Sequence, residues 1–220
     1  GYPVHVPCTM VERRCGSSQQ AVHFAAQGIA AGAYDIVLAG GIESMSRVPM
    51  GSARMGKDPH GVAYEERFPG TVGQGVSAEL IAARWGISRE EMDIYSARSH
   101  ELAEQARQEG RLAKEIIGIE TPGGLVSQDE TIRAGTTAEG LAQLKTSFNN
   151  DEIAARFPEI NWSITAGNSS QITDGASVAL VMSEAAANRL GLTPRARFVA
   201  FDVIGDDPLL MLTAPIPATQ

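Results

Sequence analysis

The sequence has few cysteines and no long apolar run, and these shortages exclude several classes of protein. Cys8 and Cys15 are its two cysteines, and their number and spacing fit neither a disulfide framework nor a zinc site. We therefore expect a reducing compartment, with the cytoplasm as the default location, and no metal. No apolar stretch reaches transmembrane length and no signal-peptide pattern opens the sequence, so neither a membrane span nor a secretory signal is predicted.

Positive charge is also in short supply, which bears on the possible partners. The sequence has 18 Lys and Arg against 26 Asp and Glu, a formal net charge of −8. Such a chain is not expected to bind nucleic acid or an anionic membrane surface. An anionic ligand would have to be held by a few local basic groups and by backbone amides. A content of 43% hydrophobic and 20% charged residues in 220 residues fits a globular protein of one or two domains.

What the sequence does contain is a cysteine at the start of a predicted helix. Cys15-Gly16-Ser17-Ser18 precedes the small-residue run QQAVHFAAQGIAAG, and we expect a helix from Gly16 to about Ala31 that ends at Gly32. Unpaired amides and the positive end of the helix dipole stabilise a thiolate at such a position, and the thiolate is the nucleophilic form of sulfur. The alternative interpretation is that Cys15 is a small buried hydrophobic residue, as many free cysteines are.

The rest of the pattern predicts alternating helices and strands. The apolar run 36–39, closed by two glycines, is typical of a buried parallel strand, and with a strand at 5–11 it would complete a strand–helix–strand unit. Residues 47–75 show no periodicity, and we expect a long irregular loop there. Helices are expected up to Gly86, from the capping box Ser88-x-x-Glu91 to Gly110, from the capping box Thr136-x-x-Glu139, and from Ser183 to Gly191. Further strands are expected at 115–121, 176–182 and 197–204.

Three blocks of the sequence, in order, closely resemble the thiolase family, which includes acetyl-CoA acetyltransferases and 3-ketoacyl-CoA thiolases. They are residues 11–46, with the cysteine turn and the motif Gly40-Gly41-x-Glu43-Ser44-Met45-Ser46; residues 164–187, with ITAGNSSQITDGA; and residues 214–219, APIPAT. The resemblance implies an α/β fold, the layered αβαβα thiolase fold, here incomplete and with an inserted loop domain.

The same resemblance divides the sequence into four segments. Residues 1–46 and 165–191 would belong to the N-terminal half of a thiolase, 47–164 would be the inserted loop domain, and 192–220 would open the C-terminal half. The first strands and helices of the family would precede residue 1. The general-base histidine, the second cysteine and the Asn-Glu-Ala-Phe element would follow residue 220. The chain alone is therefore expected to be inactive or impaired.

The resemblance also implies roles for single residues. Cys15 would be the catalytic nucleophile, with its own backbone N–H as a donor to the developing oxyanion. Glu43 would be a buried polar residue that braces the cysteine turn. The residues implied to bind coenzyme A (CoA) are Arg133 near the nucleotide, Phe148 beside the ligand, and Ala166, Ser169 and Ser170 along the pantetheine arm.

Each of these residues also has a plainer interpretation. Arg133 could be a solvated surface charge, Phe148 ordinary core, and Ser170 a turn-forming hydroxyl. Cys8 matches no family motif and is interpreted as structural.

The function implied is acyl exchange between CoA and the cysteine, in thiolytic cleavage of a 3-ketoacyl-CoA or in Claisen condensation of acetyl-CoA. CoA and acyl-CoA would be substrates, with no tightly bound cofactor. A homodimer, a homotetramer or a complementing chain is expected, with a role in lipid metabolism such as fatty acid β-oxidation. The direction of the reaction and the acyl specificity stay open.

Two other classes of function remain as alternatives. A non-catalytic thiolase-like protein could bind acyl-CoA or lipid without transferring the acyl group. A cysteine hydrolase or a redox thiol protein is the third alternative, but the sequence has neither a histidine partner motif nor C-x-x-C.

Overall fold

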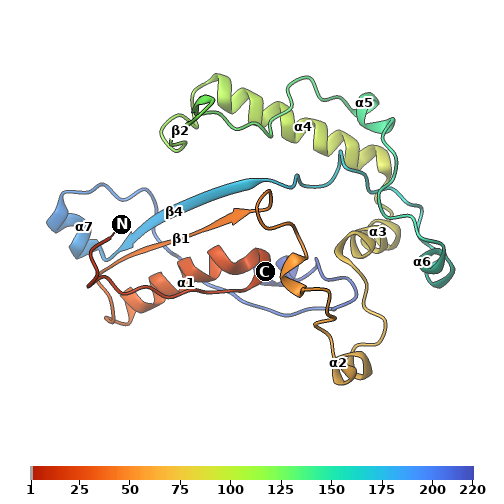
Figure 1. Ribbon diagram of the computed structural model, residues 1–220, viewed down its shortest axis with the longest axis horizontal. Helices are drawn as coiled ribbons and strands as arrows, with labels where there is room; N and C mark the ends of the chain where they lie inside the picture. Colours follow the sequence, from red (N-terminus) through yellow and green to blue (C-terminus); the bar gives the residue numbers. More distant parts are fainter. Residues whose placement is uncertain (1) are drawn as a thin grey trace. The chain divides into compact units, whose positions relative to one another are not determined.

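The computed structural model describes residues 2–220, which form two compact units (Figure 1). Unit 1 consists of residues 2–56 and 173–203, and unit 2 consists of residues 57–172 and 204–220. The chain thus leaves unit 1, builds most of unit 2 and returns. The four-segment division expected from the sequence remains a prediction, because compactness alone does not define the halves of a family fold.

Unit 1 is one long helix packed on a two-stranded sheet. Its elements are the 3-10 turn η1 (Arg14–Gly16), α1 (Ser17–Ala30), β1 (Ile36–Ser44), the 3-10 turn η2 (Ser52–Arg54), β4 (Asp174–Met182) and α7 (Glu184–Leu190). Strands β1 and β4 pair antiparallel from Ile36 opposite Met182 to Ser44 opposite Asp174. Figure 1 shows α1 running along this pair of strands.

Small side chains let α1 approach the sheet closely. Ala25 and Ala26 of α1 are buried against Ala39 of β1 and Val181 of β4. Val22, Ile29 and Val37 surround this cluster. The low polarity of the helix, which the sequence analysis used to predict contact with protein, is therefore explained by burial of one of its faces.

Two of the predicted strands are wrong. Residues 5–11 and 197–204 lie in the described part of the chain but form no strand. The predicted parallel strand–helix–strand unit is wrong too, because β1 pairs antiparallel with β4. An apolar segment becomes a strand only when a second backbone accepts and donates its hydrogen bonds. For β1 that backbone comes from residues 174–182, far along the chain.

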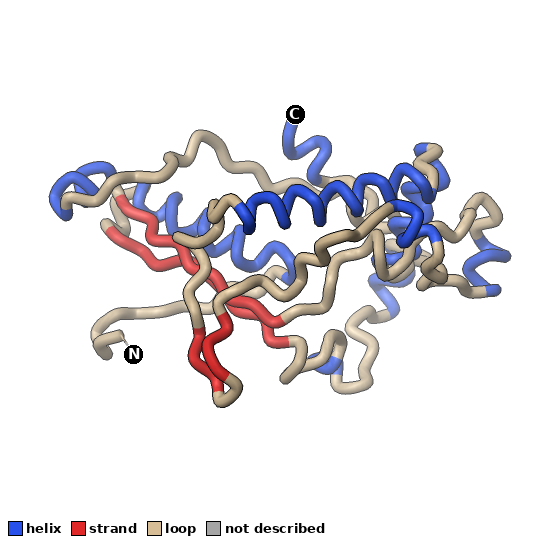
Figure 2. The backbone as a smooth tube through the Cα atoms, turned by 90° about the horizontal axis from the view of Figure 1, so that it is seen from above, coloured by secondary structure: helices blue, strands red, loops and turns tan. Residues whose placement is uncertain are grey.

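Unit 2 is mostly helical. Its elements are α2 (Val62–Arg67), α3 (Gln74–Trp85), α4 (Arg89–Gln108), β2 (Ile119–Thr121), β3 (Gly124–Val126), α5 (Ala138–Ala142), α6 (Asp151–Arg156) and α8 (Pro215–Thr219). Figure 2 shows β2 and β3 as a short hairpin and α4 as the longest helix. The core of this unit contains Leu80, Phe157 and Ile160, with Val72 and Val76 packed against them. Within residues 2–220 no helix is long and apolar enough to cross a membrane.

The predicted helix ends in both units are mostly confirmed. Ser88 and Glu91 form the expected capping box at the start of α4. Gly86 and Gly191 end α3 and α7 in the left-handed conformation, which glycine adopts without steric cost. Ser183 caps α7 as expected.

The predicted capping box at Thr136 is wrong. The cap of α5 is Thr137, whose hydroxyl accepts the N–H of Gly140 at 3.1 Å. Thr136 and Thr137 both carry a hydroxyl that could cap the helix. Which of them does so depends on the backbone conformation of the preceding turn. The helix itself is short and ends at Ala142.

Alanine at Gly40 should destabilise unit 1. An added Cβ would lie 2.2 Å from the carbonyl oxygen of Ser177 and 2.9 Å from the Cα of Val178, both on the paired strand. Because these are backbone atoms, relief would require opening the β1–β4 pair. We expect Gly40→Ala to lower the free energy of unfolding by about 1–3 kcal/mol, measured by urea denaturation. Gly175 is the matched control in the same sheet, since a Cβ there meets no atom within 4 Å. An equal loss from Gly175→Ala would contradict the account.

Candidate active site

Cys15 lies in η1, two residues before Ser17, the first residue of α1, and is exposed. The alternative interpretation of Cys15 as a buried hydrophobic residue is therefore wrong. The thiol is open to reagents from solvent, at the end of the helix where backbone N–H groups point outward. Its role as nucleophile stays a prediction.

The backbone around Cys15 is held by Ser17. The Ser17 hydroxyl accepts the N–H of Arg13 at 2.7 Å and donates to the carbonyl of Arg14 at 2.7 Å. Arg14 has a φ of 50°, in the left-handed region that costs a non-glycine residue on the order of 1 kcal/mol. The residue before the thiol is thus kept in an unfavourable conformation by a specific hydrogen-bonded turn.

The two arginines beside Cys15 are engaged with their own neighbours. Arg13 donates from Nη1 to Gln20 Oε1 at 2.9 Å. Arg14 approaches Glu12 at 4.0 Å, and the Arg14 N–H donates to the same carboxylate at 2.8 Å. These side chains are exposed, so solvent screens their charge.

The end of β1 packs against the first turn of α1. A Cβ at Gly41 would lie 2.6 Å from the hydroxyl oxygen of Ser18, so the strand passes close to the helix start and a larger residue would require the Ser18 side chain to move. Ser18 lies three residues after Cys15. Gly41 therefore brings β1 close to the first turn of α1, next to the 3-10 turn that carries the thiol.

Asp174 braces the turn after β1. The Asp174 carboxylate accepts the N–H of Ser46 at 2.9 Å and the hydroxyl of Ser44 at 3.3 Å, and it also accepts the hydroxyl of Ser46. The Ser46 hydroxyl and amide lower the pKa of Asp174. Glu43 is exposed, so the expectation that it would be buried is wrong. Consecutive side chains of a strand point to opposite faces, so Glu43 and Ile42 lie on different faces of β1. The sequence does not show which residue of a distant strand will lie beside the turn.

The stability contributed by Asp174 should depend on pH. Because its folded-state pKa lies below the ordinary value of 3.8, the ionised form stabilises the fold above that value. The contribution is lost as the pH falls through the folded-state pKa. Asp174→Asn should therefore lower the free energy of unfolding at pH 7. The difference in free energy of unfolding between this variant and the parent chain should shrink as the pH falls below about 4. Urea denaturation of both chains between pH 7 and pH 3 measures this difference. A difference that does not change with pH would contradict this assignment.

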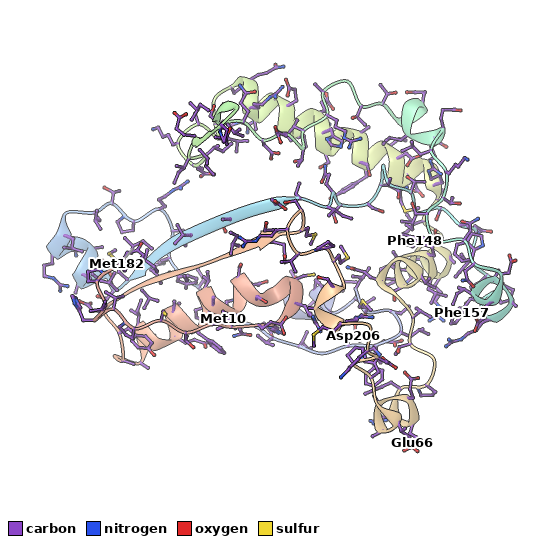
Figure 3. The ribbon with its side chains drawn as sticks, viewed as in Figure 1. Met10, Glu66, Phe148, Phe157, Met182 and Asp206 are labelled. Atoms are coloured by element: carbon purple, nitrogen blue, oxygen red, sulfur yellow. The ribbon has the colours of Figure 1, made fainter. Side chains whose placement is uncertain are left out.

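The five residues implied to bind CoA all lie in unit 2, whereas Cys15 lies in unit 1. Arg133 is exposed, and its main-chain N–H donates to Nδ1 of His100 at 3.2 Å. The side chain of Phe148, 37% exposed, packs on the first turn of α3, since a Cβ at Gly75 would lie 2.4 Å from the ring (Figure 3). Phe148 is therefore not ordinary core, because part of its surface faces solvent.

The turn 166–170 presents its small side chains to solvent. Ala166, Ser169 and Ser170 are exposed. The Ser169 hydroxyl donates to the carbonyl of Thr165 at 2.7 Å. In the described part of the chain, the Ser170 hydroxyl has no hydrogen-bond partner and is free to bond a ligand.

The turn is connected to the segments that carry the other two candidates. Gly167 packs on Leu141 and Leu144, four residues before Phe148. Gln171 donates from Nε2 to the carbonyl of Thr131, two residues before Arg133, at 3.2 Å. The structure thus brings the turn together with the chain segments around Phe148 and Arg133.

Two buried carboxylates beneath the turn were not found by the sequence analysis. Glu79 of α3 is 0% exposed and accepts hydrogen bonds from Ser163 and Ile164. Asp93 of α4 is 1% exposed and accepts from Arg89 and Asn168. A sequence signal did exist, because Glu79 interrupts the apolar run of α3 and Arg89 precedes Asp93 by one helical turn.

The fold and the site define an α/β protein with an exposed cysteine thiol at the start of a helix that packs on a sheet. The chain belongs to the thiolase family, because the family model described as "Thiolase, N-terminal domain" matches residues 1–185. Proteins named 3-ketoacyl-CoA thiolase are similar to it. That of Marinobacter nauticus is 44% identical over 96% of this chain and 52% of its own length, and that of Pseudoalteromonas translucida is 43% identical over 100% and 55%.

A solved structure confirms the expected fold. The dimeric peroxisomal thiolase of Saccharomyces cerevisiae matches with a TM-score of 0.80 and 30% sequence identity, over 95% of this chain and 52% of its own chain. The resemblance to the thiolase family and its α/β fold, expected from three sequence blocks, are thus confirmed. The chain spans about half the length of the relatives it matches.

Proposed function

We propose that this chain supplies the acyl-accepting cysteine of a 3-ketoacyl-CoA thiolase-type acyltransferase. The observation that carries the proposal is the exposed thiol of Cys15 at the start of α1, within the region that matches the thiolase family. Sulfur suits the reaction, because a thiolate attacks a thioester readily and is itself a good leaving group.

The step at Cys15 is an exchange of one thioester for another. The Cys15 thiolate attacks the acyl carbonyl carbon, a new carbon–sulfur bond forms, and the bond from that carbon to the CoA sulfur breaks. CoA leaves as a thiolate, and the proton released by Cys15 neutralises it. The backbone N–H of Cys15 donates to the carbonyl oxygen as negative charge develops there. In cleavage of a 3-ketoacyl-CoA the leaving group is the carbanion of acetyl-CoA, and in condensation the same carbanion attacks the acylated cysteine.

CoA and acyl-CoA are the substrates, with no tightly bound cofactor, and unit 2 holds them. The exposed guanidinium of Arg133 provides positive charge for the phosphates in a chain of net charge −8. The free hydroxyl of Ser170 bonds the amides of the pantetheine arm. Ala166 and Ser169 line the same turn, and the open face of Phe148 covers the ligand.

The assembly we propose is a homodimer in the cytoplasm with a role in fatty acid β-oxidation. The yeast relative of known structure is described as dimeric, and the similar bacterial proteins are named 3-ketoacyl-CoA thiolase. We assign residues 1–46 and 165–191 to the N-terminal half of the thiolase fold, 47–164 to the loop domain and 192–220 to the C-terminal half.

Incubation with acetyl-CoA tests the proposal. We expect slow, single-turnover release of free CoA, equal in amount to the acetyl group that mass spectrometry locates on the peptide that contains Cys15. The exposed Cys8 is an internal control for nonspecific thiol acylation. Binding of CoA without an adduct would favour a non-catalytic acyl-CoA-binding protein, and neither binding nor adduct would overturn the proposal.

A further inference from the structure

Glu79 fixes the backbone that leads into the turn 166–170. One of its carboxylate oxygens accepts the N–H of Ile164 at 2.7 Å and that of Ser163 at 3.0 Å. The other oxygen accepts the N–H of Ser163 at 2.8 Å and its hydroxyl at 2.9 Å. Since Glu79 is fully buried, these bonds replace its hydration, and two consecutive amides of the segment are held by one side chain of α3.

Asn168 fixes the turn itself, and Asp93 fixes Asn168. The Asn168 Oδ1 accepts the N–H of Thr165 at 2.8 Å, and its Nδ2 donates to the carbonyl of Ser163 at 3.0 Å and to Asp93 at 3.1 Å. Asp93 is oriented in turn by Nε of Arg89 at 2.6 Å, and the same guanidinium donates to the carbonyls of Leu141 and Leu144. The turn is therefore tied to α3, to α4 and to the segment that begins at α5.

These hydrogen bonds all lie on the inner side of the turn 166–170. The inner side of the turn is bonded to buried groups at Ser163, Ile164, Thr165 and Asn168, whereas Ala166, Ser169 and Ser170 face solvent. A turn held from beneath in this way binds a ligand without first losing conformational entropy. Buried groups of α3 and α4 thus converge on a segment whose outer side is open to a ligand.

We infer that Glu79 and Asp93 are positioning residues for acyl-CoA, which hold the turn 166–170 in the shape that accepts the pantetheine arm. The inference rests on the proposed function, because the ligand is the one proposed there. Neither carboxylate touches the ligand in this account. Each acts through the backbone of the turn, Glu79 through Ser163 and Ile164, and Asp93 through Asn168.

Asp93→Asn is the most informative variant. Asparagine has nearly the same shape, but its NH2 group cannot accept the hydrogen that Arg89 or Asn168 donates to the carboxylate. We expect the concentration of acetyl-CoA that half-saturates acylation of Cys15 to rise about tenfold. The acylation rate at saturating acetyl-CoA should stay within about twofold. Isothermal calorimetry with CoA should give a parallel rise in the dissociation constant.

The controls separate positioning from loss of folding. Glu101→Gln changes a carboxylate on the exposed surface of α4, where Glu101 is paired with Arg98 at 3.9 Å, and should alter neither quantity. Arg89→Lys is a milder second variant, because lysine keeps a cation beside Asp93 but loses the fork that reaches Leu141 and Leu144. Arg89→Lys should also raise the half-saturating concentration of acetyl-CoA, but by less than Asp93→Asn does.

The outcomes distinguish this inference from the proposed function. A parent chain that neither binds CoA nor becomes acylated would overturn the proposed function. A parent chain that does both, with folded Asp93→Asn or Arg89→Lys variants that bind CoA as tightly, would overturn the positioning role alone. A variant that is thermally less stable but reaches half-saturation at the same acetyl-CoA concentration as the parent would also overturn the positioning role. Such a result is what a purely structural role predicts.

Discussion

Replacing Cys15 by alanine should abolish transfer of the acyl group from acetyl-CoA to the chain. The thiolate is the atom that forms the new bond, and no neighbouring side chain can replace it, so we expect a loss on the order of 10³-fold or more in the rate of acylation. The measurement is the mass of the intact chain over time at a fixed excess of acetyl-CoA. Because Cys15 is exposed and lies in a 3-10 turn outside the packed core, the variant should unfold at the same urea concentration as the parent.

Cys8→Ala is the matched control for that prediction. Cys8 is also exposed but does not lie at a helix start. We expect Cys8→Ala to be acylated at the parent rate. Acylation that persists in Cys15→Ala, or that falls equally in both variants, would mean that the acyl group reacts with surface nucleophiles without selection.

Replacing Glu79 by alanine should cause the largest loss of stability among the variants considered. The substitution removes the acceptor of two amides and one hydroxyl, at Ser163 and Ile164, in a place that water does not reach. Leaving a buried hydrogen-bond donor without its acceptor costs about 1–3 kcal/mol, and the loss at these donors together is a large part of the ~5–15 kcal/mol that stabilises a typical domain.

Urea denaturation followed by circular dichroism measures this loss. Glu101→Ala, on the exposed surface of α4, should change the free energy of unfolding by no more than about 0.5 kcal/mol. If Glu79→Ala were as mild as Glu101→Ala, the carboxylate would not be holding the segment 163–164.

Much of the local structure could be predicted because its signals lie within a few residues. The capping serines Ser88 and Ser183 and the terminating glycines Gly86 and Gly191 act on the adjacent helix turn, so their sequence pattern is sufficient. The direction of β1 could not be predicted in this way. Its partner is β4, and the residues between them do not encode whether two apolar segments pair parallel or antiparallel.

The site shows the same division. The position of Cys15 at the start of α1 was predicted from the residues that follow it. The buried carboxylates were missed because Glu79 bonds to Ser163 and Asp93 to Asn168, each across many residues of chain. Asp174, which accepts the N–H of Ser46 in the turn after β1, was missed for the same reason. A polar residue in an apolar helix reports that a partner exists, but only the fold identifies that partner.

The reverse transfer tests the central claim most directly. The chain is acylated with acetyl-CoA, separated from free ligand and then mixed with CoA alone, and the acetyl-CoA that forms is measured together with the mass of the Cys15 peptide. We predict that acetyl-CoA is regenerated in the amount of acetyl group lost from Cys15, because a thioester on this sulfur exchanges in both directions. An acetyl group that stays on the chain in excess CoA, or that is lost without forming acetyl-CoA, would contradict the account.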